Sequence, residues 1–365
     1  MSSFTAISLF SGMGGDSLGI KNAGGNVIAY SEFWNKACET HDQNFPNCTL
    51  LRNDKEKPKD QTNIQKITDA QFEEYRNRID LIFAGFPCQG FSQAGKKMPS
   101  DPRNTLFREF LRTTKLINPK YIIGENVKGL LTRKTDNGDL FIDIIQNEFE
   151  ALGYTIYKKV MKCNLYGIPQ NRHRLIIVGV RNDLGKTYVF PEEDEDESLS
   201  IRSIIKFSME GAIKVEPEDF DMSVIPEECI VKDMENDEVE MESGDRKPHP
   251  NLKLLLKQKD YLYKGDVYPT RIHFGKRIPV GGEIVDIRKP INTIICTYAR
   301  QPRFFIPQQN KNGYYLRCLL PNELKQIQSF PANYNICGNK KEQIVQIGNA
   351  VPPLLIQKII NNILN

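Results

Sequence analysis

Short apolar runs alternate with amphipathic stretches along the first half of the chain. Six runs are rich in β-branched or aromatic residues and are bounded by turn formers or polar residues, which predicts strands: 5–10, 26–31, 80–84, 120–124, 154–162 and 175–180. Between them, five stretches have the spacing of amphipathic helices: 17–22, 36–45, 64–78, 105–117 and 140–152. This alternation predicts an α/β fold built as a doubly wound, mostly parallel sheet.

The regular alternation ends near residue 182. From 182 to 310, charge blocks, prolines and short apolar runs replace it, which predicts a second, smaller and less regular domain. Two further helices are predicted at 317–329 and 354–364. We therefore expect a first domain over 1–181, a second over 182–310, and a segment 311–365 that returns to the first.

Composition describes an ordinary soluble protein. Of 365 residues, 39% are hydrophobic and 26% charged, which allows a large core. No apolar run approaches the ~20 residues of a membrane span, and residues 1–5 lack a signal-peptide layout. The eight cysteines include no Cys-x-x-Cys pair, so neither a zinc site nor a disulfide framework is indicated and a reducing intracellular compartment is expected.

Charge is unevenly distributed although the net charge is only +3. Residues 192–197 and 216–245 are acidic, whereas 246–303 is rich in lysine and arginine. Either an acidic segment lies beside a basic face, or both are solvated loops; charge alone favours the second interpretation.

Chemically versatile residues follow four of the predicted strands: Gly12, Glu32, Cys88 and Glu125. Because the carboxyl ends of parallel strands meet at one edge of a sheet, these residues are expected to lie close together. Taken alone, Cys88 is most simply a small buried hydrophobe. Four such placements together predict an active site.

The first strand, a glycine-rich turn and a helix form the opening of a nucleotide-type site. The spacing is Gly-x-Gly-Gly rather than Gly-x-Gly-x-x-Gly, so a dinucleotide is not favoured. Glu32, after the second strand, is placed to bind ribose hydroxyls, and Phe33 could stack on an adenine. Arg172 and Arg174 alternate along the chain, so both would project to one face and fix a phosphate or a polar base edge. His173 between them is read as a bystander.

Together these blocks resemble the DNA (cytosine-5) methyltransferases of restriction-modification type. The resemblance covers nearly the whole chain outside 182–310, and the blocks follow the family's order. It implies a fold of the S-adenosylmethionine-dependent methyltransferase type, with S-adenosylhomocysteine as product and no metal. The cofactor-binding residues that it implies are Phe10, Ser11, Gly12, Met13, Gly14, Gly15, Glu32, Phe33, Asn63, Ile64, Pro87, Leu106, Asn349 and Val351. Asn63 stands where the family usually has an aspartate, but its side-chain oxygen can still accept a hydrogen bond.

The resemblance also implies the chemistry. Cys88 would add to C6 of a cytosine flipped out of the duplex, Glu125 would hold the N3 edge, and Arg172 and Arg174 would orient the base. The loop 91–104, basic and full of turn formers, would clamp the DNA. Residues expected to contact DNA there and in the second domain are Gln89, Ser92, Lys96, Lys97, Arg103, Thr270, Arg271, His273, Lys276 and Arg277.

Three other functions remain open at this stage. The same chemistry could act on tRNA, although related tRNA enzymes lack a recognition domain of about a hundred residues. A non-catalytic DNA-binding homologue would be expected to lose Cys88, Glu125 or the glycine loop. The glycine turn alone also allows a nucleotide-binding oxidoreductase. The favoured interpretation predicts a monomer that binds double-stranded DNA without a membrane, in the bacterial cytoplasm near the nucleoid or encoded by a virus, with a separate restriction endonuclease.

Overall fold

The structure, a computed structural model, describes residues 4–53, 62–87, 106–135, 137–237, 247–250, 252, 261–263, 269–274 and 280–364. The chain divides into two compact units. The first comprises Met1–Glu195, Gln328–Gly338 and Asn349–Asn365, and the second comprises Asp196–Ile327 and Asn339–Gly348. Each unit is described by itself below.

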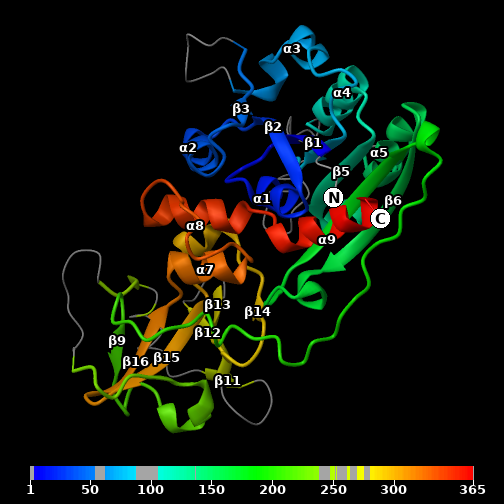
Figure 1. Ribbon diagram of the computed structural model, residues 1–365. Coiled ribbons are helices and arrows are strands. Elements are labelled where there is room, and N and C mark those ends of the chain that lie inside the picture. The colour runs from blue at the N-terminus through cyan, green and yellow to red at the C-terminus, as the bar shows by residue number, and fades with distance from the viewer. Residues whose placement is uncertain are drawn as a thin grey trace. The chain divides into compact units, whose positions relative to one another are not determined.

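A seven-stranded sheet organises the first unit, in the order β3-β2-β1-β4-β5-β8-β6 (Figure 1). The strands are β1 (Phe4–Leu9), β2 (Gly25–Ser31), β3 (Thr49–Leu50), β4 (Leu81–Ala84), β5 (Tyr121–Val127), β6 (Tyr154–Lys162) and β8 (His173–Arg181). The first five are parallel to their neighbours, and β8 lies antiparallel between β5 and β6. A mostly parallel α/β sheet, as the sequence predicts, is confirmed.

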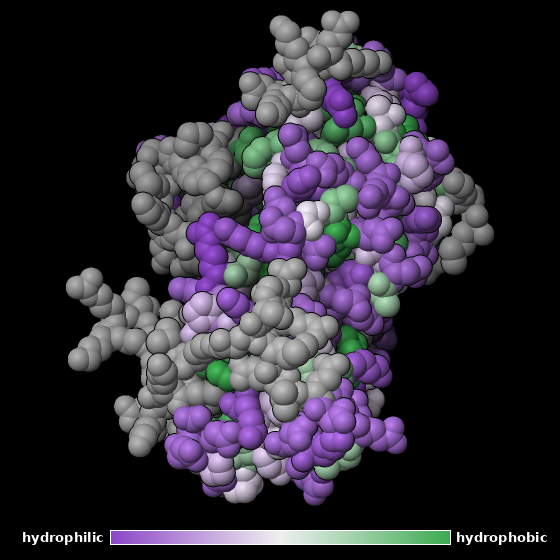
Figure 2. All heavy atoms as spheres, turned by 90° about the vertical axis from the view of Figure 1, so that its left-hand side faces the viewer, coloured by the Kyte–Doolittle hydropathy of each residue, from purple (hydrophilic) through white to green (hydrophobic). Residues whose placement is uncertain are grey.

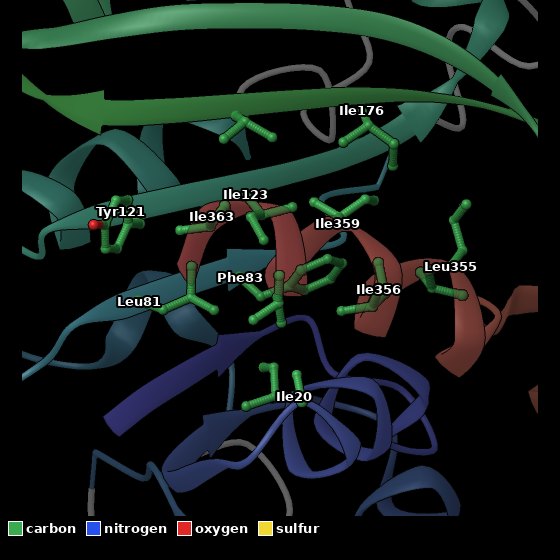
Figure 3. Packing of buried hydrophobic residues seen from close by; sticks show 14 of the residues in the cluster. Ile20, Leu81, Phe83, Tyr121, Ile123, Ile176, Leu355, Ile356, Ile359 and Ile363 are labelled. Atoms are coloured by element: carbon green, nitrogen blue, oxygen red, sulfur yellow. The ribbon is translucent and has the colours of Figure 1, made fainter. Parts of the chain in front are cut away.

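Helices cover both faces of this sheet, so the central strands β4 and β5 are buried on both sides. One buried cluster joins the sheet to α3 (Asp69–Glu73), α4 (Phe107–Ile117) and α5 (Phe141–Ala151). The other joins it to α1 (Gly15–Asn22) and α9 (Pro353–Leu364). In Figure 3, Phe83 and Ile123 of the sheet lie against Ile356 and Ile359 of α9. The helix α9 is therefore part of the core of the first unit. A further helix, α2 (Asn35–Asn44), follows β2.

Two glycines allow α1 to approach the C-terminal segment closely. A Cβ atom on Gly15 would lie 2.2 Å from the carbonyl oxygen of Val351, and one on Gly19 would lie 2.6 Å from that of Pro353. No side chain fits at such distances without moving the backbone. The start of α1 therefore packs directly against the backbone of the segment 351–353.

In the residues that the structure describes, the second unit contains a mixed sheet and the helices α7 and α8. Its strand order is β11-β12-β13-β15-β16-β9, and β10 pairs with β15. The strands are β9 (Ile213–Val215), β10 (Val231–Lys232), β11 (Tyr261–Tyr263), β12 (Pro269–Phe274), β13 (Val280–Ile284), β15 (Phe304–Asn310) and β16 (Gly313–Cys318). The helices are α7 (Pro321–Ile327) and α8 (Lys340–Asn349), whose last residue belongs to the first unit. Two short strands, β7 (Gln170–Asn171) and β14 (Ile291–Asn292), lie in the first and second units respectively.

Buried polar contacts hold the second unit together. Arg317 is fully buried, and its guanidinium donates to both carboxylate oxygens of Glu323, at 2.7 and 2.9 Å, and to Oε1 of Gln308 at 3.1 Å. These hydrogen bonds offset the free-energy cost of removing the guanidinium of Arg317 from water.

Two predicted helices are wrong. In place of 64–78 the chain forms a 3-10 turn, η1 (Ile64–Lys66), and then α3. Thr68 separates them because it caps α3 reciprocally with Gln71, which starts a new helix. In place of 317–329, Arg317 lies in β16, paired with Ile306 of β15, and the helix begins at Pro321. Pairing with β15 also puts 313–327 in the second unit, away from the rest of the predicted returning segment.

Hydrophilic side chains predominate among the described residues on the face shown in Figure 2, with hydrophobic ones scattered between them. No helix in the described part of the chain is long and apolar enough to cross a membrane.

Candidate active site

The carboxyl ends of β1, β4 and β5 meet at one edge of the first unit's sheet. A Cβ atom on Gly85 would lie 3.8 Å from the carbonyl oxygen of Phe10 and 3.9 Å from Oε2 of Glu125. Asn126 Nδ2 donates to the carbonyl oxygen of Phe86 at 3.1 Å. The turn 85–87, which leads to Cys88, is therefore held between the glycine loop and the end of β5.

Glu125 lies inside β5 rather than after it. The strand extends three residues beyond the predicted end because β8 pairs with it over its whole length, up to Val127 opposite Arg174. Glu125 is 9% exposed, and its Oε1 lies 2.7 Å from Nε of Arg174. This ion pair leaves Oε2 directed toward the 85–87 turn, which gives the edge an anchored carboxylate.

Arg172 and Arg174 have different surroundings. Arg174 contacts Glu125, whereas Arg172 is 1% exposed and its Nη2 donates to the carbonyl oxygen of Ala350 at 3.0 Å. Arg172 thus contacts the segment between Asn349, which is exposed, and Val351, which is buried against Gly15. A role of Arg172 in orienting a base stays a prediction.

The glycine loop is joined to the end of β2. Phe10, Gly12 and Gly14 adopt positive φ angles of 57°, 55° and 86°, which turn the backbone away from the line of β1. The amide of Gly12 donates to Oε2 of Glu32 at 2.9 Å, and the amides of Phe33 and Trp34 donate to Oε1 at 2.9 and 2.8 Å. Burial raises the pKa of Glu32, and these three hydrogen bonds oppose that increase.

These residues fit a nucleoside-bearing cofactor. Glu32 is fixed by backbone donors and keeps lone pairs that can accept hydroxyl groups. The adjacent Phe33 side chain is 73% exposed, which is unusual for a large hydrophobe and leaves a ring face free to stack. The roles of Glu32 in binding ribose hydroxyls and of Phe33 in stacking on an adenine stay predictions.

The remaining predicted cofactor residues are spread around this edge. Asn63 caps η1, where its Oδ1 accepts from the amide of Gln65 at 3.1 Å. Ile64 is buried in the cluster on the α3–α5 face, and Leu106, just before α4, packs against it. Ser11, Met13 and Gly15 are buried in the glycine loop, and Pro87 is half-buried.

Several predicted residues lie outside the described residues: Cys88, Gln89, Ser92, Lys96, Lys97, Arg103, Lys276 and Arg277. Thr270, Arg271 and His273 lie on β12 of the second unit. Among the described residues, no group of three or more His, Cys, Asp or Glu side chains is arranged to hold a metal ion.

A buried polar network lies beneath the glycine loop and was not predicted. Asp16 is 2% exposed and accepts hydrogen bonds from the hydroxyls of Ser8 and, at 3.4 Å, Ser11. Ser11 contacts Ser17 at 3.3 Å, and Ser17 contacts Nε2 of His41 at 2.9 Å. The sequence signal was an aspartate directly after the glycine turn, in the first turn of the helix α1. The network ties β1, the loop, α1 and α2 together.

This network gives two opposing pH dependences. Burial raises the pKa of Asp16 from 3.8 to about 7. The contribution of Asp16 to the free energy of unfolding is therefore complete below pH 3.8 and is lost as pH rises through about 7. Burial lowers the pKa of His41 from 6.5 to about 3. The contribution of His41 to the free energy of unfolding is therefore complete above pH 6.5 and is lost as pH falls through about 3. Between about 4 and 6.5 the two effects oppose each other.

We expect Asp16→Asn to remove the Asp16 contribution, so that between about pH 4 and 7 its free energy of unfolding has a more positive slope against pH than that of the wild type. His41→Gln should remove the His41 contribution, so that between about pH 4 and 6.5 its free energy of unfolding has a more negative slope than that of the wild type. Urea denaturation across this range measures both. Parallel curves for the wild type and both variants would contradict the assignment.

Comparisons with known proteins identify the family of the chain. The family model described as "C-5 cytosine-specific DNA methylase" matches residues 4–365. The chain is 32% identical to the Type II methyltransferase M.Eco47II of Escherichia coli, covering 96% of this chain and 76% of that protein. It is 31% identical to the Type II methyltransferase M1.HphI of Haemophilus parahaemolyticus, covering 99% and 87%.

Solved structures share the fold. A mutant of Spodoptera frugiperda DNMT2 superposes with a TM-score of 0.65 at 19% identity, covering 99% of this chain and all of that chain. A putative DNA modification methyltransferase encoded within an E. coli prophage superposes with a TM-score of 0.62 at 20% identity, covering 99% of each chain.

Proposed function

The chain belongs to the C-5 cytosine-specific DNA methylase family, and we propose that its methylation of C5 of cytosine in DNA takes place at the carboxyl edge of the first unit's sheet, with S-adenosylmethionine as methyl donor.

One observation carries the assignment of the site. The ion-paired Glu125, the turn 85–87 and the glycine loop meet at one edge, where the Gly85 position lies within 4 Å of both Phe10 and Glu125. A nucleophile that follows Pro87 in sequence would start beside an anchored carboxylate. The Gly12–Glu32 contact lies at the adjoining strand ends β1 and β2. Acid, turn and nucleoside site therefore share one edge.

The chemistry assigns a role to each group. C5 of cytosine is a poor nucleophile, and a thiolate that adds to C6 turns C5 into an enamine-like carbon. In this proposal Cys88 forms the bond to C6, and Glu125 holds the N3 edge and favours protonation at N3 as negative charge develops. Arg174, through its contact with Glu125 at 2.7 Å, keeps the carboxylate in place. After methylation the C5 proton leaves to a base and Cys88 is eliminated.

The residues that would hold the cofactor are the glycine loop, Glu32 and Phe33. S-adenosylmethionine, when bound, supplies an electrophilic methyl group on a sulfonium. Glu32 would accept the ribose hydroxyls, Phe33 would stack on the adenine, and the backbone from Phe10 to Gly15 would line the remaining part. Asn63, Ile64, Pro87, Leu106, Asn349 and Val351 complete the proposed set.

A cytosine in a duplex cannot reach this edge, so the proposal includes flipping of the target base, which costs a few kcal/mol. Gln89, Ser92, Lys96, Lys97 and Arg103 would contact the DNA near the flipped base. Thr270, Arg271, His273, Lys276 and Arg277 would contact the target sequence from the second unit. The Type II methyltransferase relatives support a restriction-modification setting. The proposal adds a monomeric enzyme of the bacterial cytoplasm and a separate endonuclease.

The test is direct. The purified protein is incubated with S-adenosylmethionine and either mixed-sequence duplex DNA or total tRNA, and the nucleosides from each are analysed by mass spectrometry. We expect 5-methylcytosine in DNA only. Product in tRNA alone, or in neither with cofactor still bound, would contradict the proposed function.

A further inference from the structure

Two exposed lysines flank the Glu125–Arg174 pair on neighbouring strands. Lys128 directly follows β5 and begins a 3-10 turn, η3 (Lys128–Thr132). Lys162 ends β6 and is paired in register with His173, the first residue of β8. Arg174 Nη1 donates to the carbonyl oxygen of His173 at 2.8 Å, and Arg174 itself pairs with Val127. The three strand ends thus bring Lys128, His173 and Lys162 together in a row.

The lysines of β6 differ in how their charge is compensated. Lys158 lies 3.7 Å from Asp143, and Lys159 lies 3.0 Å from Glu193. In the described part of the chain, no carboxylate lies within 4.0 Å of the ammonium group of Lys162 or of Lys128, and both side chains are exposed. The nearby Glu125 is already paired with Arg174. The charge of Lys162 also interacts at longer range with Glu193. Among the described residues, Lys128 and Lys162 therefore lack a direct ion pair at the strand ends that border the candidate active site.

The half-buried His173 lies close enough to these positive charges for them to affect its pKa. Burial lowers its pKa, and the positive charges of Lys128, Lys162 and Arg174 lower it further. A neutral imidazole between two ammonium groups adds a hydrogen-bonding group without further repulsion. The row thus combines two cations and one neutral polar group.

From this geometry we propose that Lys128 and Lys162, with His173 between them, form a phosphate-binding surface for the backbone of the substrate DNA. The inference rests on the proposed function, since it takes duplex DNA as the substrate. Adjacent strands lie about 4.8 Å apart, so the backbone of Lys128, directly after β5, and that of Lys162, on β6, are roughly 10 Å apart with β8 between them. That spacing covers about two to three nucleotides of one DNA strand. Duplex DNA offers phosphates at this repeat, and exposed lysines bind them without reading sequence.

Salt dependence of DNA binding tests this surface. The variants are Lys128→Gln, Lys162→Gln and the double variant, with Lys158→Gln as matched control on the same strand. Binding of a labelled mixed-sequence duplex is measured between about 50 and 200 mM salt. Each lysine that contacts a phosphate should contribute about 0.9 to the slope of log K against log salt, so the double variant should lose about 1.8. At about 0.1 M salt, affinity should fall roughly tenfold for each lysine.

The outcomes separate this inference from the proposed function. A slope unchanged in the double variant, while the wild type methylates DNA, would overturn the phosphate surface and leave the function standing. An equal loss of DNA affinity in Lys158→Gln, Lys128→Gln and Lys162→Gln would also overturn the phosphate surface, because the loss of any positive charge would then have the same effect. A reduced slope with no 5-methylcytosine from the wild type would support the surface and contradict the function.

Discussion

Replacing Cys88 by alanine should abolish methyl transfer, with turnover reduced on the order of 10³-fold or more. The thiolate is the only group in the proposed chemistry that can form the bond to C6, and alanine offers no substitute. Cofactor binding should be retained, since Glu32 and the glycine loop are unchanged. The measurement is incorporation of labelled methyl groups into duplex DNA under single-turnover conditions.

A covalent trap gives this prediction a second readout. A duplex containing 5-fluorocytosine carries fluorine where the C5 proton must leave, so the bond from Cys88 should persist as a denaturant-resistant adduct. The wild type and the control Cys296→Ala, a half-buried cysteine of the second unit, should both form it, and Cys88→Ala should not. An adduct or full turnover in Cys88→Ala would refute the assigned nucleophile.

Glu125→Gln should lower turnover by about 10²- to 10⁴-fold, the range that general acid–base groups contribute. The glutamine amide can still accept the hydrogen bond from Arg174 Nε, so the local geometry should survive while the negative charge beside N3 is lost. We therefore expect the loss in kcat, with little change in KM for DNA or in affinity for the cofactor. Steady-state kinetics measures kcat and KM for DNA separately.

The matched control is Glu150→Gln. Glu150 is an exposed residue of α5 that accepts from Gln146 at 2.7 Å, so the same chemical change there should leave turnover unaltered. A variant at Glu125 that kept full kcat, or one that lost only DNA affinity, would contradict a role of this carboxylate in the chemical step.

The sequence predicted the elements whose pattern is local. β4 (81–84), β6 (154–162) and α5 (141–151) appear within one residue of their expected bounds, because a buried apolar run or a helical spacing is sufficient to specify them. The two helix predictions that were wrong concern segments in which another interaction, a helix cap or strand pairing, competes with a continuous helix. Thr68 starts a separate helix through its cap, and Arg317 joins β16 because β15 pairs with it.

Candidate residues followed the same division. The sequence identified the strand ends that carry Gly12, Glu32 and Glu125, and the structure brings these ends to one edge. It did not identify Asn126, whose amide holds Phe86 from 40 residues away, or the network of Asp16 with His41. Such partners are chosen by packing between distant segments, for which the sequence has no local signal.

The sequence by itself determined the alternation of strands and helices, the glycine turn, the order of its motifs and, through them, the family. The tertiary structure alone decided which side chains meet. Arg172 and Arg174 look equivalent in sequence, yet one contacts Ala350, 178 residues away, and the other contacts Glu125. The reason is physical: local spacing fixes backbone conformation, whereas strand register and the return of the chain at 349–353 fix the surroundings of each side chain.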